Sequence, residues 1–176
     1  MKLITKIRLL ILFFMTALIV SGLTAMPAET ELRWLLQYKN MFSEWLANWM
    51  QTCYDALVDT NAKYPYLAYG YDWLAFAHYV IALSFIGPYR DPVKNIWIID
   101  WQIICCIAVF PLALIAGPIR QIPVFHIIID CCFGIVGIIP LLICRSWIKK
   151  LAVYQISWLF LMPAPLKEHI CLLPWH

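Results

Sequence analysis

Apolar stretches of membrane-spanning length constrain this sequence more than any other feature. Four predominantly apolar stretches occupy residues 9–28, 73–89, 96–117 and 122–144. Each holds about 17 to 23 residues, and a helix that rises 1.5 Å per residue needs about 20 to cross the ~30 Å hydrocarbon core of a bilayer. We therefore expect an all-α fold in which four transmembrane helices form an integral membrane bundle within a single domain, residues 1–150.

The overall composition agrees with a membrane protein. Hydrophobic residues make up 64% of the 176 residues and charged residues only 13%, whereas soluble domains are about half apolar and about a quarter charged. So few polar residues cannot cover a core of this size in water. The net charge of +3 lies in short clusters beside apolar stretches, which argues against binding of nucleic acid. The expected partners are the lipid bilayer, other membrane proteins or further copies of the chain.

The basic residues predict how the chain is oriented in the membrane. With the N-terminus inside, eight basic residues fall in cytoplasmic segments and four fall outside, as the positive-inside rule requires. The cytoplasmic set is Lys2, Lys6, Arg8, Arg90, Lys94, Arg145, Lys149 and Lys150, and the external set is Arg33, Lys39, Lys63 and Arg120. We expect a multi-pass protein of a bacterial inner membrane with both termini in the cytoplasm.

The first apolar stretch has two interpretations. It is long enough for an uncleaved first span, but Val20-Ser21-Gly22 resembles a small-residue cleavage site, so that about residues 1–25 could be a signal peptide. Both interpretations place residue 29 outside the membrane.

Two segments outside the four stretches are expected to lie at the membrane surface. Between about residues 29 and 60, apolar residues recur every three or four positions with polar residues between them, which predicts an amphipathic external helix that begins after Pro27. It would lie along the outer surface, pack over the bundle or bind a partner. The apolar tail, residues 151–176, is expected to be interfacial or poorly ordered.

The joints between the last three stretches share a pattern. They read GPYRDP, residues 87–92, and GPIRQIP, residues 117–123. In each joint we expect the glycine to adopt a left-handed cap, the first proline to end the helix, and the second proline to begin the next one.

Five cysteines lie inside apolar stretches, where cysteine behaves as a small hydrophobe. They are Cys105, Cys106, Cys131, Cys132 and Cys144. The sequence contains no Cys-x-x-Cys pair, so it offers no spacing for a zinc or redox site. Close packing between helices is the expected role of the two adjacent pairs.

Ionisable residues inside apolar stretches are the candidate functional groups, because each costs about 2.5–3.5 kcal/mol at the centre of a bilayer. His78, His126 and Asp130 are expected about 7, 6 and 12 Å below the outer surface. His126 and Asp130 are four residues apart and therefore share one helix face. With Asp72 and Arg120 at the rim, these residues predict a polar pocket between the second and fourth spans.

Asp100 is expected away from this pocket, about 6 Å from the inner surface, where the side chains of Lys94 or Arg90 could reach it.

Three interpretations of the pocket remain open. Its residues could join helices in a structural or assembly protein, or they could conduct protons or bind a small ion or solute in a transporter. In the third interpretation, His78 and His126 ligate the iron of a b-type haem. No hydrolase, protease or phosphate-binding motif is found, so we expect no enzymatic activity and no other metal or cofactor.

The chain resembles a group of small bacterial multi-pass membrane proteins of unassigned function. The resemblance lies in AYGYDWLAFAHYVIALSFIGPYRDPVKN, PLALIAGPIRQIP and FGIVGIIPLLIC, and it covers roughly residues 5–150. It implies a helical bundle in an inner membrane. It implies no activity, and no catalytic or binding residue is carried over from it.

Overall fold

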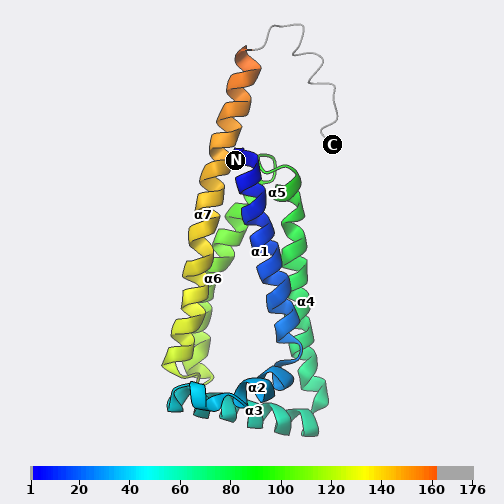
Figure 1. Ribbon diagram of the computed structural model, residues 1–176, viewed down its shortest axis with the longest axis vertical. Helices are drawn as coiled ribbons and strands as arrows, with labels where there is room; N and C mark the ends of the chain where they lie inside the picture. Colours follow the sequence, from blue (N-terminus) through cyan, green and yellow to red (C-terminus); the bar gives the residue numbers. More distant parts are fainter. Residues whose placement is uncertain (1, 162–176) are drawn as a thin grey trace. The chain divides into compact units, whose positions relative to one another are not determined.

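The described part of the chain, residues 2–161 of the computed structural model, is built of helices and contains no strand (Figure 1). In chain order the elements are α1 Leu3–Ala25, α2 Ala28–Leu36, η1 Lys39–Met41, α3 Glu44–Lys63, η2 Pro65–Ala68, α4 Tyr69–Ser84, α5 Ile86–Arg90, α6 Ile96–Ile119 and α7 Val124–Leu161. The predicted all-α fold class is confirmed for these residues.

The chain forms two compact units. Among the described residues, unit 1 comprises residues 2–12 and 85–161, and unit 2 comprises residues 13–84. Helix α1 therefore contributes its first turns to unit 1 and the remainder to unit 2.

Within residues 2–161, three helices are long and apolar enough to cross a membrane: α1, α6 and the Val124–Ser157 part of α7. They correspond to the predicted stretches 9–28, 96–117 and 122–144. The stretch 73–89 differs, because its helix α4 ends at Ser84 and α5 begins at Ile86. A physical reason lies at Pro88, which has no N–H to donate to the carbonyl of Ser84 and whose ring crowds that carbonyl.

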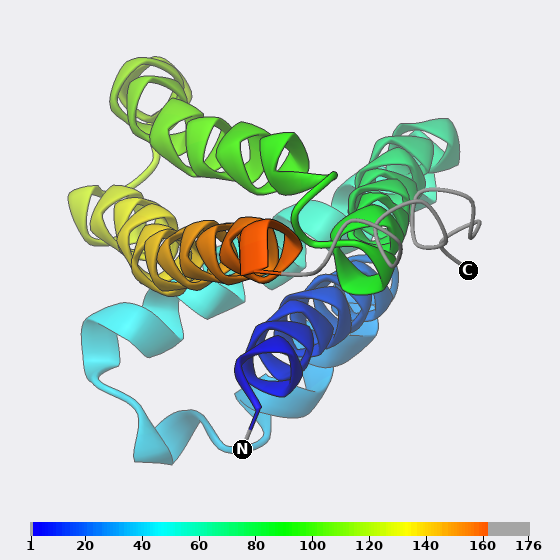
Figure 2. The same ribbon diagram turned by 90° about the horizontal axis from the view of Figure 1, so that it is seen from above.

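Helices α6 and α7 form an antiparallel hairpin in unit 1 and lie side by side in two perpendicular views (Figure 2). Helix α7 continues past Cys144, the predicted end of the span, to Leu161. The first part of the predicted tail is therefore a continuation of α7. Residues 162–176, where the rest of that prediction falls, lie outside the described residues.

The core of unit 1 gathers large apolar side chains from the first turns of α1 and from α6 and α7. Ile7, Ile11, Ile99, Leu141 and Ile148 are each at most 1% exposed. The opposite faces of the hairpin are also apolar but remain uncovered. Ile119 and Phe133, for example, are 73% and 70% exposed. Such uncovered apolar faces suit contact with lipid and are costly in water.

The segment of about residues 29–60 is divided into two helices rather than forming the continuous helix predicted there. Helix α2 ends at Leu36, the 3-10 turn η1 follows, and α3 begins at Glu44. The backbone of Ser43, just before α3, is extended, with φ −63° and ψ 147°, which is the usual conformation of a residue preceding a helix. The break follows from the local preference of Asn40 and Ser43 for turns and helix starts.

The expectation of left-handed glycines at the two joints is wrong. No glycine in the described residues has a positive φ, and the residue that does is Gln121, with φ 57°. Gly117 instead stays inside α6, where a Cβ atom would lie only 2.6 Å from Cδ1 of Ile127. Gly117 thus allows α7 to approach closely, and the turn takes its left-handed residue from Gln121. Pro118 also lies within α6 and does not end it.

Candidate functional site in the hairpin of α6 and α7

Small residues set the distance between α6 and α7. A Cβ atom on Gly134 would lie 2.9 Å from the carbonyl oxygen of Cys106 and 3.2 Å from Cε2 of Phe110. A Cβ atom on Gly137 would lie 2.9 Å from Sγ of Cys106. These distances leave no room for a side chain at either glycine. The predicted role of Cys106 in close helix packing agrees with this geometry.

An ion pair joins the two helices nearer the start of α6. Nε of Arg145 on α7 donates to Oδ1 of Asp100 on α6. Their side chains are 37% and 41% exposed, so the pair is only partly covered by protein. Sequence analysis placed the partner of Asp100 at Lys94 or Arg90, but the structure supplies Arg145 from the neighbouring helix. Asp100 lies about twenty residues before the turn between α6 and α7, and Arg145 lies about twenty residues after it. Residues equally far from the turn of an antiparallel hairpin lie side by side, so this spacing could have identified the pair.

His126 and Asp130 form the second polar pair of the hairpin. They lie on one face of α7, as their spacing predicts, with Nε2 of His126 3.9 Å from Oδ1 of Asp130. At this distance the two groups attract one another when the ring is protonated, but no direct hydrogen bond is formed. Their side chains are 44% and 43% exposed. The pair therefore forms a polar edge on the first part of α7, residues 124–144, which is otherwise apolar.

The remaining predicted residue of unit 1, Arg120, follows the last residue of α6. Its backbone N–H donates to the carbonyls of Ala116 and Gly117, at 2.9 and 3.1 Å. Its exposed side chain lies in the turn that leads to α7. Arg120 therefore occupies the same end of the hairpin as His126.

His78 and Asp72 belong to α4 in unit 2. Nδ1 of the half-buried His78 lies 2.7 Å from the carbonyl oxygen of Leu74 in the preceding turn, which places the ring proton on Nδ1 in the neutral form. Asp72 is exposed and lines a pocket of about 250 Å³ together with Glu29 and Asn61. The pocket predicted between the second and fourth spans would combine these two residues of unit 2 with Arg120, His126 and Asp130 of unit 1. This pocket remains a prediction.

Close helix packing also occurs within unit 2. A Cβ atom on Gly22 of α1 would lie 2.6 Å from Cε1 of Tyr79 and 3.0 Å from the carbonyl oxygen of Ala75 on α4. Ala75 is fully buried, and the hydroxyl of Tyr79 lies 3.9 Å from the sulfur of Met26. In both units, therefore, small residues set the helix spacing, a packing mode that is common inside membranes.

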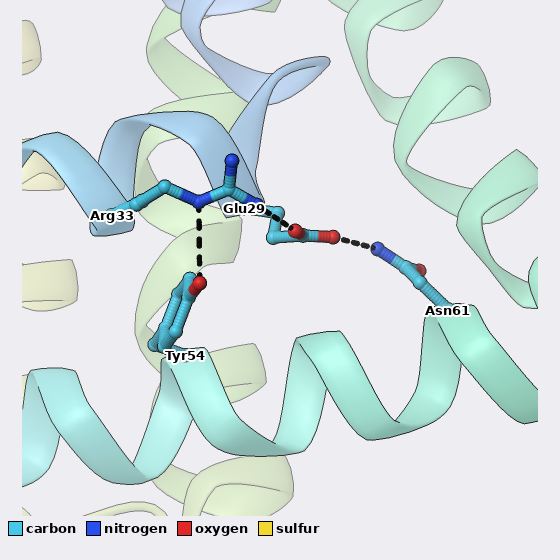
Figure 3. Close-up of polar contacts among 4 residues, drawn as sticks. All are labelled: Glu29, Arg33, Tyr54 and Asn61. Atoms are coloured by element: carbon cyan, nitrogen blue, oxygen red, sulfur yellow. Dashed lines mark hydrogen bonds and ion pairs between the residues drawn. The ribbon is translucent and has the colours of Figure 1, made fainter.

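A polar cluster that sequence analysis missed joins α2 to α3 (Figure 3). Glu29 accepts hydrogen bonds from Arg33, at 2.6 Å, and from Asn61, at 2.9 Å. Nε of Arg33 also donates to the hydroxyl of Tyr54, at 3.2 Å, and this contact raises the pKa of Arg33. The i,i+4 spacing of Glu29 and Arg33 was visible in the sequence, but their partners on α3 are far away along the chain. The cluster fixes the position of α2 against α3.

Within the described residues, no group of three or more histidine, cysteine, aspartate or glutamate side chains could hold a metal ion. The described cysteines carry free thiols. In α3, outside the spans, burial raises the pKa of the Cys53 thiol. This shift lowers the fraction of reactive thiolate at neutral pH further.

Comparison with protein-family models, with curated proteins and with solved structures gives no match to this chain. The resemblance to small bacterial membrane proteins stays a prediction.

Proposed function

We propose that this chain is a four-span protein of a bacterial inner membrane, with both termini in the cytoplasm and a structural or assembly role. Helices α1, α6 and α7 supply three of the spans, and α4 is the fourth. The proposal is supported by the apolar character of these helices and by the excess of basic residues at the ends assigned to the cytoplasm.

Helix α4 by itself is shorter than the hydrocarbon core of a bilayer. A helix from Tyr69 to Ser84 covers about 24 Å, which is less than the ~30 Å of the hydrocarbon core. Phe85, which follows it, keeps helical dihedral angles, φ −71° and ψ −10°, and α5 continues from Ile86 to Arg90. The helical stretch from Tyr69 to Arg90 holds enough residues to cross, and tyrosine and tryptophan at its start suit the outer interface.

Reporter fusions test this layout directly. We expect fusions after residues 60 and 119 to report the periplasm and a fusion after residue 92 to report the cytoplasm. The comparison of 60 with 92 isolates α4, because only a crossing by α4 separates those two positions. A periplasmic signal at 92 together with one at 60 would show that α4 does not cross. The comparison of 92 with 119 isolates α6 in the same way.

The observation that carries the assembly role is the polar edge of α7. His126 and Asp130 lie inside a span yet keep more than two fifths of their side-chain surface uncovered. An ionised carboxylate facing lipid costs about 2.5–3.5 kcal/mol. Contact with a polar group on another membrane helix removes much of this cost and contributes about 0.6–2 kcal/mol to association. The edge is therefore suited to helix assembly.

Substitution of the polar edge tests its role. We expect His126→Leu and Asp130→Leu each to lower the folded yield and the melting temperature in detergent, with a loss of about 0.6–2 kcal/mol. The control is Ile129→Leu, which puts a leucine at a position of the same helix that is 45% exposed. Variants that insert, melt and associate like the parent would remove the assembly role. A Soret band lost in His78→Ala, or a pH-dependent flux in proteoliposomes, would replace it with the haem or transporter interpretation.

A further inference from the structure

Unit 1 contains a large basic pocket that the proposed function does not use. Its volume is about 960 Å³, and its lining includes Arg8, Arg90 and Lys94 as positive charges and Asp91 as a negative charge. The lining also includes the apolar side chains of Ile4 at the start of α1, Val93 in the loop before α6 and Leu151 on α7. The pocket thus combines a net positive charge with an apolar wall.

The positive charges differ in how they are engaged. Nε of Arg8 donates to the carbonyl of Tyr89 at 3.1 Å, Nη2 lies 3.4 Å from the carbonyl of Arg90, and the guanidinium lies 5.6 Å from the ring centroid of Tyr89. Arg8 is thereby fixed against the end of α5. By contrast, the side chains of Arg90 and Lys94 form no ion pair with a described carboxylate, and both are exposed. These two side chains are available to an anionic ligand.

The loop that carries Arg90 and Lys94 is held in place by its own hydrogen bonds. Nδ2 of Asn95 donates to the carbonyls of Gly87 and Asp91, at 3.1 and 3.0 Å. The carboxylate of Asp91 accepts the backbone N–H of Lys94 at 3.1 Å. Asp91, the only carboxylate among the described lining residues, is thus engaged by the loop itself. The loop is ordered before any ligand arrives, which lowers the entropic cost of binding.

The position of the pocket identifies the ligand class. Arg8 lies in the first turns of α1, and Lys94 lies just before the start of α6, so the pocket opens where two spans enter the membrane. Phospholipid headgroups occupy this level of a bilayer. A free phosphate ion would use the charges but gain nothing from the apolar wall, whereas a phospholipid uses both. We infer that this pocket binds the headgroup of an anionic phospholipid of the cytoplasmic leaflet, with Arg90 and Lys94 holding the phosphate.

This inference rests on the membrane orientation in the proposed function, and its test is a binding measurement on the full chain in detergent. The probes are a phosphatidylglycerol and a phosphatidylcholine with the same acyl chains, and inorganic phosphate. We expect phosphatidylglycerol to bind and to raise the melting temperature, whereas the other two probes do not. Stabilisation by phosphatidylcholine to the same extent, or by inorganic phosphate, would overturn the assignment of an anionic lipid.

Substitution of the two available cations locates the site. We expect Lys94→Gln to weaken phosphatidylglycerol binding about fivefold, and Arg90→Gln with Lys94→Gln about twenty-fivefold, from the loss of one and two charges near a lipid surface. Lys94→Arg keeps the charge and should keep the affinity. The matched control is Lys149→Gln with Lys150→Gln, which removes the same charge from α7 outside this pocket.

The outcomes distinguish this site from general charge attraction and from the topology. Equal weakening by the control would show that affinity follows total charge, which would overturn the pocket assignment. The Lys94→Gln variant should fold like the parent, because the hydrogen bond of Lys94 within the loop uses its backbone N–H. A loss of binding in this variant can therefore be assigned to the missing charge. Reporter fusions that contradict the four-span layout while lipid binding is retained would refute the topology alone.

Discussion

Replacing Gly134 with alanine is expected to destabilise the α6–α7 hairpin by about 2 kcal/mol, more than the same change at Gly137. The added Cβ atom would lie 2.9 Å from the backbone oxygen of Cys106. A backbone oxygen inside a helix cannot move without shifting the whole helix, and overpacking of this kind costs about 1–3 kcal/mol. The measurement is the free energy of unfolding in a titration with denaturing detergent.

Gly137 and Gly70 provide a comparison and a control for this prediction. Gly137→Ala should cost less, because its added Cβ atom meets Sγ of Cys106, and Cys106→Ala in the same chain should restore most of the loss. Gly70→Ala in α4 is the control, since nothing lies within 4 Å of its added Cβ atom. Alanine is favoured over glycine in a helix, so this variant should be neutral or stabilised by up to about 1 kcal/mol. Equal effects at Gly134 and Gly70 would contradict the close contact of α6 with α7.

Replacing Arg145 with leucine is expected to cost about 2–3 kcal/mol, more than replacing its partner Asp100 with leucine. Arg145→Leu leaves a carboxylate inside a span without its cation, and a lone acid there is expensive. Asp100→Leu leaves an arginine whose long side chain can extend to the headgroups, which lowers the cost. The double variant should be closer to the parent than Arg145→Leu, because removing both charges leaves none unpaired. Detergent titration of the four proteins measures this order.

Lys149→Leu provides the control for this cycle. Lys149 lies one turn further along α7, is exposed, and forms no ion pair with a described carboxylate, so its loss should change the stability by no more than about 0.5 kcal/mol. An effect of Arg145→Leu no larger than that of Lys149→Leu would show that the ion pair does not hold the hairpin together.

Local sequence patterns predicted much of the fold. The apolar stretches 96–117 and 122–144 correspond to α6, Ile96–Ile119, and to the first part of α7. The i,i+4 spacing placed His126 and Asp130 on one face, where the structure has them. Both successes depend on periodicity within one helix, which is fixed by backbone geometry alone.

The positions at which helices begin and end were predicted less well. The segment of about residues 29–60 is periodic throughout, yet its helix is interrupted between Leu36 and Glu44. Periodicity indicates which face of a helix is apolar but not whether a turn interrupts the helix.

The stretch 73–89 was predicted as one helix that Pro88 would end, whereas α4 ends at Ser84 and α5, Ile86–Arg90, contains Pro88. Pro111 and Pro140, by contrast, lie inside α6 and α7 without dividing them. Proline is tolerated or disruptive depending on whether neighbouring groups satisfy the freed carbonyl.

The sequence by itself determined that the described part of this chain contains apolar helices of membrane-spanning length, because the length and hydropathy of a segment decide whether lipid can surround it. Only the tertiary structure decided that Asp100 pairs with Arg145, that Gly134 rather than a larger residue faces Cys106, and that Gln121 turns the chain. The reason is physical. Segment hydropathy sums over neighbouring residues, whereas the register of two helices is chosen by contacts between residues distant in sequence, where an error of one ångström separates a clash from a fit.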